Sequence, residues 1–284
     1  MSTVSRRTLL AGIAALPAAF GTRADAAAER GTLRIGFQRS STLTYLLKLN
    51  GGLEKALEPL NIGVSWHEFT SGLPILEALN LGRIDFSADV ADTVPVFAQA
   101  AGARIVYVAE EAASPTAQAI VVPGDSAIRS IADLKGKKIA VTKGAGSHYL
   151  LLAALGTQNL SFKDIKPAYL NPADGRTALV GGSVDAWVAW DPFLASAQQQ
   201  SGVRVVVDGT GLASYKRYYL TSEAFADRHP DALATIFETL RNTGEWAKSH
   251  SDEVAATLST HWGIAPAVIA AANQRRADQV GPVR

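Results

Sequence analysis

Short runs rich in aliphatic and aromatic residues alternate with helical segments from Thr32 to about residue 208. This alternation predicts an α/β fold with mostly parallel strands, because the helices that link parallel strands pack on the faces of the sheet. One helical segment, 42–57, spaces its leucines so that most of them share one face. The predicted strands are 33–37, 63–68, 84–88, 104–109, 118–122, 138–142, 165–170, 185–190 and 203–208.

The last part of the chain, after Tyr218, has a different pattern. Successive helical segments occupy 222–229, 230–249 and 252–261, without strands between them. Each begins with Ser, Pro or Asp, which favour the first positions of a helix. We therefore expect this part of the chain to be mostly helical.

Two stretches of small residues and helix breakers interrupt the alternation, at 112–116 and at 209–211. Such stretches are typical of linkers, and 284 residues are enough for two lobes with separate cores. We expect the chain to leave a first lobe at the first break and to return at the second, with a ligand bound in the cleft between hinged lobes. The predicted lobes are 29–114 with 212–284, and 115–211.

Segments 79–86 and 179–187 share one local pattern. Each reads as the end of a helix, then glycine, then a strand that opens with an aliphatic residue and Asp. The pattern predicts that one folding unit is used in both lobes. Because Gly and Asp are common turn residues, ordinary turn chemistry is the alternative.

A pair of arginines, Arg6 and Arg7, precedes an apolar stretch over 9–20. The stretch is shorter than the roughly 20 apolar residues that span a membrane, and small residues follow it. These features predict a Tat-type export signal, cleaved after Ala26 or Ala28, and a periplasmic mature protein. The predicted signal peptide covers 1–28.

Charge and cysteine content exclude several kinds of partner. Without the signal the chain has 24 basic and 25 acidic residues, because that segment holds three arginines and one aspartate. A near-neutral chain without a basic run lacks the electrostatic footprint of nucleic-acid binding. The absence of cysteine excludes disulfides and a thiol-linked lipid anchor, and it is compatible with an oxidising compartment.

The stretch 138–152, KIAVTKGAGSHYLLL, joins a predicted strand to a predicted helix through Gly144 and Gly146. At such a junction the first N–H groups of the helix lack intrahelical partners, and the helix dipole is positive. Glycine lets a ligand approach these groups closely, so a small anion is the expected guest. Glycine-rich turns also occur without any ligand, so the motif needs support from the rest of the chain.

Signatures of catalysis are missing from the sequence. It contains no Gly-x-Ser-x-Gly elbow, no complete dinucleotide loop at 144–149 and no P-loop at 136–138. The five histidines lack the spacing of a metal-binding motif. We therefore expect a protein that is not an enzyme and that has no catalytic residues, cofactor or metal.

Eight short motifs match a pattern shared by one group of transport proteins. They are 37–41 (FQRSS), 76–80 (LEALN), 84–86 (IDF), 95–102 (PVFAQAAG), 134–138 (LKGKK), 143–151 (KGAGSHYLL), 172–174 (PAD) and 184–193 (VDAWVAWDPF). Together they resemble the aliphatic-sulfonate-binding proteins of ABC importers, a branch of the nitrate, sulfonate and taurine receptors. The resemblance extends over 33–276, and Trp-Asp-Pro at 190–192 favours the sulfonate branch.

The resemblance implies a two-lobed periplasmic-binding-protein fold of type II, each lobe a mixed, mostly parallel sheet flanked by helices. It implies a monomer that captures a small sulfonate anion between its lobes and delivers it to ABC transporter permease subunits, as a step of sulfur metabolism. Taurine, nitrate and a thiamine-precursor pyrimidine are alternative ligands. A pyrimidine-synthesising enzyme of the same fold is a further alternative, which the export signal disfavours.

The resemblance places the ligand contacts in loops that follow strands. In the first loop, Gln38, Ser40 and Ser41 offer an amide, hydroxyls and N–H groups to sulfonate oxygens, although a serine here also serves as a helix cap. In the last loop, Trp190 offers an aromatic face to the tail of the sulfonate. The remaining contacts are Gly144, Gly146, Ser147, His148 and Tyr149, with Ser71 and Gly72 as lesser candidates.

Two of these loops contain residues with competing interpretations. The imidazole of His148 can donate to an anion, but a lone histidine more often satisfies a local hydrogen bond. We expect Asp191 to be structural, as a helix cap before Pro192, because a carboxylate would repel a sulfonate. Trp187 precedes Trp190 by three residues and points to the opposite face of its strand, so we expect it in the core.

The chain departs from the family pattern in two places. Segment 87–95 lacks the usual turn glycine and one of two prolines, and it contains Asp89 and Asp92. This loop should border the cleft, so we count Asp89 among the ligand contacts; the two carboxylates favour a zwitterion such as taurine, unless Asp92 only caps the next helix. The chain also ends at Arg284, earlier than the family usually does, and we expect part of the first lobe to be less covered.

Overall fold

In the computed structural model the described residues are 31–284, so the export signal predicted over 1–28 lies outside them. All nine predicted strands are confirmed, with small shifts at their ends. Two further strands follow the second break, β10 (Arg217–Ser222) and β11 (Val280–Gly281). The predicted strands are β1 (Gly31–Gln38), β2 (Ile62–Phe69), β3 (Phe86–Ala91), β4 (Ile105–Glu111), β5 (Gln118–Pro123), β6 (Lys138–Val141), β7 (Lys166–Tyr169), β8 (Ala186–Trp190) and β9 (Val203–Asp208).

Helices occupy the segments between the strands. The single helix predicted over 42–57 is two helices, because Gly51 adopts a left-handed conformation with φ 64° and ends the first of them. None of the helices within 31–284 is long and apolar enough to cross a membrane. The helices are α1 (Thr42–Asn50), α2 (Gly52–Leu57), α3 (Gly72–Asn80), α4 (Thr93–Ala100), α5 (Gly146–Gly156), α6 (Pro172–Val180), α7 (Phe193–Gln200), α8 (Glu223–Arg228), α9 (Pro230–Ser249), α10 (Ser251–Trp262) and α11 (Pro266–Gln274).

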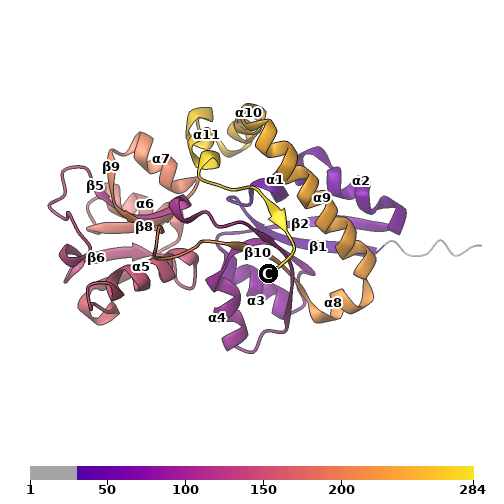
Figure 1. Ribbon diagram of the computed structural model, residues 1–284, viewed down its shortest axis with the longest axis horizontal. Coiled ribbons are helices and arrows are strands. Elements are labelled where there is room, and N and C mark those ends of the chain that lie inside the picture. The colour runs from indigo at the N-terminus through magenta and orange to yellow at the C-terminus, as the bar shows by residue number, and fades with distance from the viewer. Residues whose placement is uncertain (1–30) are drawn as a thin grey trace, which may run out of the picture.

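Two sheets, one in each lobe, organise these elements (Figure 1). The strand order is β11-β4-β10-β3-β1-β2 in the first sheet and β7-β6-β8-β5-β9 in the second. In each sheet, one strand that arrives from the other lobe is inserted antiparallel between two strands: β10 between β3 and β4, and β5 between β8 and β9.

The mixed sheets are confirmed, but parallel pairs do not predominate. Within residues 31–284, the parallel pairs are β1 with β2 and β3, and β6 with β7 and β8; the other pairs are antiparallel. The inserted strands enter from the other lobe instead of following a helix on the same sheet, so they run against both neighbours. The prediction of mostly parallel strands therefore holds for only one half of each sheet.

The Gly-x-x-Asp repeat predicted from the sequence corresponds to a repeated structure. The glycine after each helix is left-handed, with φ 65° and 67°. The N–H of Asp85 donates to the carbonyl of Arg34 at 2.8 Å, and the N–H of Arg34 donates back to the Asp85 carboxylate at 3.0 Å. Asp185 makes the same exchange with Lys138, at 2.8 and 2.7 Å. Because one pattern of bonds joins equivalent strands in both lobes, it marks one folding unit used twice.

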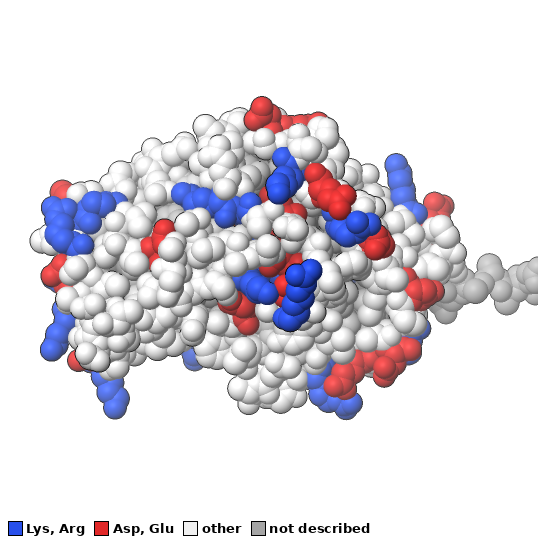
Figure 2. Space-filling model, viewed as in Figure 1, with Lys and Arg blue, Asp and Glu red and all other residues white. Residues whose placement is uncertain are grey.

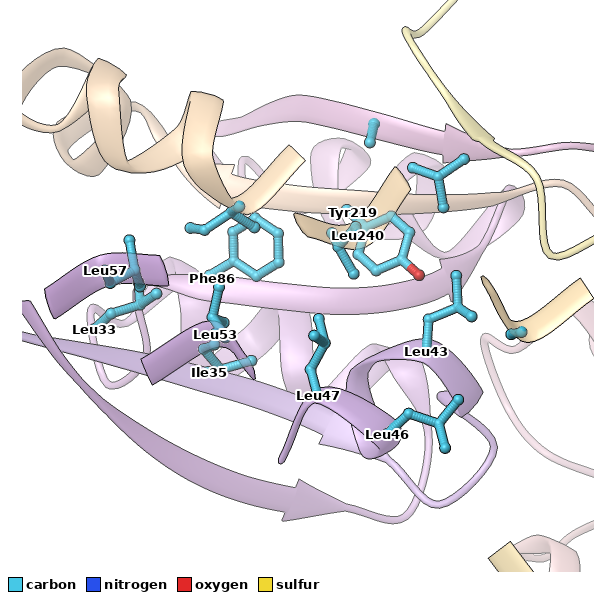
Figure 3. Packing of buried hydrophobic residues seen from close by; sticks show 14 of the residues in the cluster. Leu33, Ile35, Leu43, Leu46, Leu47, Leu53, Leu57, Phe86, Tyr219 and Leu240 are labelled. Atoms are coloured by element: carbon cyan, nitrogen blue, oxygen red, sulfur yellow. The ribbon is translucent and has the colours of Figure 1, made fainter. Parts of the chain in front are cut away.

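The core of the first lobe lies between its sheet and helices α1, α2, α9 and α10. Figure 3 shows Leu33 and Ile35 of β1 facing the leucines of α1 and α2, with Phe86 and Tyr219 on the neighbouring strands. Helix α9 adds Leu240 to this core. The C-terminal helices therefore cover this face of the first lobe.

Three chain segments cross between the lobes, one more than predicted. The N–H of Ser114 donates to the carbonyl of Ser214, and the N–H of Ala277 donates to the hydroxyl of Ser114, both at 3.1 Å. The third crossing exists because α11 packs against α7 of the second lobe before the chain returns to β11 in the first sheet (Figure 1). Hydrogen bonds thus join all three segments at the hinge.

The surface in Figure 2 carries acidic and basic side chains interspersed over both lobes. This distribution agrees with the nearly balanced charge of the sequence, which has 27 basic and 26 acidic residues. This face therefore lacks a broad basic area that would attract anions over a long range.

Candidate binding site between the lobes

Strand ends, helix N-termini and a crossing segment meet around a small cavity between the lobes. Its volume is ≈ 20 Å³, which is about the room that one water molecule needs. Both lobes supply its walls, so a ligand held here would contact both. Six of the predicted contacts line it, namely Gln38, Ser40, Gly72, Asp89, Gly146 and Trp190, together with Ala91, Val94, Ala145, Tyr215 and Arg217.

The lobes are closed on this cavity. A Cβ atom added to Gly146 would lie 2.8 Å from the Cβ of Ala91 and 2.9 Å from Cε2 of Tyr215. A Cβ at Gly144, where φ is 71°, would lie 2.7 Å from Cδ2 of Leu73 in the first lobe. Both positions need glycine, because the backbone of the second lobe here comes directly against side chains outside that lobe.

The N-terminus of α5 supplies backbone donors on the second-lobe side. The helix begins at Gly146, and the residue before it, Ala145, has no side chain that accepts from the first N–H groups. The hydroxyl of Ser147 is fully buried and has no hydrogen-bond partner within residues 31–284. Free N–H groups at the positive end of a helix favour an anion.

The loop between β1 and α1 supplies polar groups on the first-lobe side. Nε2 of Gln38 donates to the carbonyl of Asp89 at 3.0 Å. The hydroxyl of Ser41 accepts from the N–H of Gln38 at 3.2 Å, so Ser41 braces this loop and does not line the cavity. Ser40 lines the cavity, while its carbonyl accepts from the guanidinium of Arg276.

Five buried charged side chains cluster beside the cavity: Asp89, Glu111, Arg217, Arg276 and Asp278. Oδ2 of Asp89 lies 3.2 Å from Nη1 of Arg217 and 3.3 Å from Nη2 of Arg276. Glu111 forms ion pairs with the same two arginines. Because Asp89 and Arg217 also line the cavity, a ligand there would contact this charge cluster.

The charge cluster has one excess negative charge when every group is ionised, because it contains three carboxylates and two guanidinium groups. Burial, followed by repulsion from Glu111, raises the pKa of Asp89 well above its ordinary value. Burial lowers the pKa of Arg217, but the nearby Glu111 and Asp89 outweigh that effect and raise it. With Asp89 neutral, Arg217 keeps positive charge to share with an anion in the cavity.

His148 and Tyr149 lie outside the cavity lining. Nδ1 of His148 accepts from the N–H of Gly144 at 3.2 Å, and its ring stacks on Phe97 of the opposite lobe with centroids 6.0 Å apart. Burial, and then the nearby Lys143, lower the pKa of His148, so the ring is neutral near pH 7. This geometry fits the local-hydrogen-bond interpretation, and it gives the ring an aromatic contact across the cleft.

Trp190 and Trp187 occupy opposite faces of β8. Trp190 lines the cavity, and Trp187 is buried in the second-lobe core as predicted. Asp191 is structural: its Oδ1 accepts from the N–H of Ala195 at 3.0 Å. Arg275 donates to both oxygens of Asp191, at 2.7 and 2.8 Å. The N-cap of α7 is Pro192, so Asp191 lies one residue earlier than a cap; its carboxylate binds the first turn of α7 and fixes the end of α11 to the second lobe.

Three further polar residues, two of them sequence candidates, have partners elsewhere or are buried apart from the cavity. Ser71 is buried before α3 and does not line the cavity. Asp92 accepts from the hydroxyl of Ser214 at 2.7 Å, which ties the start of α4 to a crossing segment. Arg176 of α6 donates to the hydroxyl of Ser196 at 3.0 Å, so its charge is used within the second lobe.

Sequence reasoning missed the positive charge of the site. Arg217 opens β10, which the sequence marked only as a return point, and Arg276 follows α11, which was not predicted. One signal was available, because Arg217 and Tyr219 alternate along the strand and both face the interior. Their common partner, Glu111, is far away in the sequence and becomes visible only in the fold.

The paired sheets with inserted strands, closed on a cavity, define the two-lobed periplasmic-binding-protein fold of type II. The chain belongs to the family described as NMT1/THI5 like, which matches residues 61–254. It is 41% identical to an aliphatic sulfonates-binding protein of Escherichia coli (strain K12), over 92% of this chain and 80% of the relative.

Two solved structures are similar over most of their length. One is the alkanesulfonate-binding protein SsuA from Xanthomonas axonopodis pv. citri bound to MOPS, with 37% identity, a TM-score of 0.85, and coverage of 91% of this chain and 89% of that chain. The other is the periplasmic aliphatic sulphonate binding protein SsuA from Escherichia coli, with 40% identity, a TM-score of 0.80, and coverage of 89% and 87%. These likenesses extend well beyond the segment that contains the cavity.

Proposed function

We propose that this chain is an extracytoplasmic receptor of an ABC importer, which captures a small sulfonate between its lobes and delivers it to the permease. The observation that supports this proposal most directly is a cavity closed by both lobes. The buried guanidinium of Arg217 lies on one side of it and the free N–H groups of α5 lie on the other. The names of the similar proteins from Escherichia coli and Xanthomonas support a sulfonate as the ligand and the periplasm as the location.

Capture follows from the chemistry of the lining groups. A sulfonate has three oxygens that accept hydrogen bonds, and Arg217, Ser40 and the N–H of Gly146 are donors from different parts of the cavity wall. Because these donors converge only when the lobes are closed, the ligand favours the closed form by its differential affinity. Opening at the hinge would separate the donors and release the ligand unchanged.

Taurine is a second candidate ligand, favoured by one observation. Oδ1 of Asp89 is buried at the cavity wall and has no hydrogen-bond partner within residues 31–284. An ammonium beside this oxygen would favour the ionised carboxylate and lower its pKa again. A sulfonate without an ammonium would instead be compatible with a neutral Asp89.

The test is titration calorimetry of the purified mature protein with ethanesulfonate, taurine, an arylsulfonate, sulfate, nitrate and a pyrimidine. We expect saturable heat from at least one sulfonate, because only sulfonates combine the three oxygens with a tail. NMR of the recovered ligand should show it chemically unchanged, as a receptor requires. Heat from nitrate or the pyrimidine with none from any sulfonate would overturn the proposal, and a converted ligand would indicate an enzyme.

A further inference from the structure

A sulfonate in the cavity would bring a second excess negative charge to a charge cluster that already holds one. Two members of the cluster also line the cavity, so the ligand and the cluster share one buried region. Such a region solvates charge poorly, and two uncompensated negative charges are strongly disfavoured there. The anion must therefore be accompanied by a proton or by a positive group. The members come from β3 (Asp89), β4 (Glu111), β10 (Arg217) and the segment after α11 (Arg276 and Asp278).

The basic residues that adjoin the two buried arginines in the chain do not supply the missing positive charge. Nζ of Lys216 lies 2.8 Å from Oε1 of Glu110. Nε of Arg275 lies 2.7 Å from Oδ2 of Asp191. Each of these pairs is already neutral as a whole, so neither has positive charge to spare for an anion in the cavity.

A proton taken up by the cluster has two places to go. Glu111 is held as a carboxylate, because Oε1 accepts from the hydroxyl of Tyr219 at 2.6 Å and Oε2 pairs with both arginines. The pKa values of Tyr219 and Tyr215 are raised, above all by burial, so both phenols already hold their protons. The remaining carboxyl groups are those of Asp89 and Asp278.

Asp89 is the carboxyl group of these two that lines the cavity. Its Oδ2 accepts from both arginines, while its Oδ1 is buried and has no hydrogen-bond partner within residues 31–284. A protonated Oδ1 is a donor that needs an acceptor, and a sulfonate oxygen is one. Burial, followed by repulsion from Glu111, raises the pKa of Asp89 well above its ordinary value, although Arg217 opposes the rise.

We propose that Asp89 binds the sulfonate as a carboxylic acid, donating its proton from Oδ1 to a sulfonate oxygen, so that capture takes up a proton from solvent wherever Asp89 was ionised before. This inference rests on the proposed function, because it assumes that the sulfonate occupies the cavity beside Arg217. The bound form holds more protons than the free form, so affinity falls as pH rises. The ammonium of taurine replaces the proton, so taurine should take up none and should release one where Asp89 was protonated.

The test is titration calorimetry of the purified mature protein with ethanesulfonate and taurine at pH 6, 7 and 8. Each titration is repeated in phosphate and in imidazole, because the dependence of the observed heat on the ionisation heat of the buffer counts the protons taken up. Neither buffer is a sulfonate, and a titration with phosphate itself in imidazole checks that phosphate leaves the site free. Ethanesulfonate should bind about three- to tenfold more weakly at pH 8 than at pH 6, since a fully coupled proton changes an equilibrium constant tenfold per pH unit.

Three variants locate the proton. Asp89→Asn cannot ionise, so its affinity for ethanesulfonate should not change with pH and its proton uptake should vanish. Asp278→Asn should keep the uptake, which separates the two buried carboxyl groups. Asp133→Asn is the matched control, because Asp133 is an exposed carboxylate of the second lobe, and it should behave like the unaltered protein. Infrared spectra of the unaltered protein need no variant: at pH 8, ethanesulfonate should produce the carbonyl band of a protonated carboxyl group, and taurine should not.

The outcomes separate this inference from the proposed function. If ethanesulfonate binds with equal affinity at all three pH values and without proton uptake, the inference is wrong while sulfonate capture stands. If Asp278→Asn abolishes the uptake and Asp89→Asn does not, the proton lies on Asp278 and its assignment to Asp89 is wrong. If no sulfonate binds at any pH, the proposed function itself fails.

Discussion

At the scale of single residues, folding raises the pKa values of two buried acids beside the cavity, Asp89 and Asp278. Asp278 lies in the segment that returns from α11, with a left-handed φ of 45°, and is almost completely buried. Burial, followed by repulsion from Glu111, raises its pKa to about 7, against an opposing effect of Arg217. A carboxyl group held in this way keeps its proton to a far higher pH in the folded protein than in the unfolded chain.

The raised pKa of Asp278 predicts a loss of stability with rising pH. Between about pH 4 and pH 7 the folded protein binds more protons at this group than the unfolded chain does, so the free energy of unfolding falls as pH rises through that window. Because the amide introduced by Asp278→Asn cannot ionise, this substitution should reduce the fall in the free energy of unfolding by at most about 4 kcal/mol. Urea unfolding at pH 4 and pH 8 measures the effect.

Asp133 provides a control of opposite sign for this experiment. Hydrogen bonds from the backbone of Arg129, and then from the side chain and backbone of Ser130, lower the pKa of this exposed carboxylate. Asp133→Asn should therefore cost stability at pH 8, and this cost should disappear only as pH falls below the ordinary range of an aspartate, so for this variant the urea measurements extend below pH 4. If Asp278→Asn shows the same pH slope as the unaltered protein, the buried proton is not at Asp278.

At the scale of elements, the second lobe depends on a close approach between α6 and its sheet. A Cβ atom at Gly175 would lie 2.5 Å from Nε1 and 2.9 Å from Cδ1 of Trp187. Trp187 is buried on the strand next to the helix and is surrounded by core residues, so its ring cannot easily move away. Glycine at this helical position is therefore explained by packing, although it has a lower helix propensity than alanine.

Gly175→Ala should destabilise the protein by about 1–3 kcal/mol, because an extra methyl group in a filled core forces the ring or the helix to shift. Gly156→Ala is the comparison, since no atom lies within 4 Å of the added Cβ at that helical position, and it should be neutral or slightly stabilising. Chemical unfolding gives both values. Combining Gly175→Ala with Trp187→Phe should recover part of the loss, and no recovery would mean that the clash is not the cause.

At the scale of the whole molecule, the two lobes are joined by three crossings and closed by direct contact. Consecutive arginines after α11 bind different lobes: Arg275 pairs with Asp191 of the second, and Arg276 pairs with Asp89 of the first. On the opposite side of the closure, His148 stacks on Phe97. From these contacts we expect a hinge at the crossings and closing surfaces at α4 and α5.

Gly146→Ala should hinder closure and leave the fold intact. Its Cβ would meet Ala91 and Tyr215 at less than 3.0 Å only while the lobes are shut, so the open form would avoid the clash by keeping them apart. We expect sulfonate binding to weaken at least tenfold, which corresponds to about 1.4 kcal/mol, with little change in Tm. Calorimetry measures the affinity, and small-angle scattering with excess ligand should show a less compact molecule.

Gly156→Ala, at the other end of the same helix, serves as the control for closure and should bind like the unaltered protein. A large drop in Tm with unchanged affinity would show that Gly146 matters for the backbone geometry of α5 alone. Weakened binding with full compaction would place its role in direct contact with the ligand.

The sequence alone was enough for features that depend on neighbours along the chain. The nine predicted strands, the C-terminal helices and the repeated Gly-x-x-Asp turn follow from periodicities of two or about 3.6 residues and from the conformational freedom of glycine. The opposite directions of Trp187 and Trp190 follow from the same rule. The glycine-rich junction between β6 and the start of α5 was likewise recognisable, while its role as an anion site stays a prediction.

Only the tertiary structure decided which distant segments meet. The insertion of β10 and β5 and the third crossing through α11 depend on contacts between segments far apart in the sequence, which no local pattern encodes. The burial of Arg217 and Arg276 was not predicted, because a charged side chain is buried only when distant partners compensate for its lost hydration. The partners that do so, Asp89 and Glu111, come from other strands, so the charge of the site is a property of the fold.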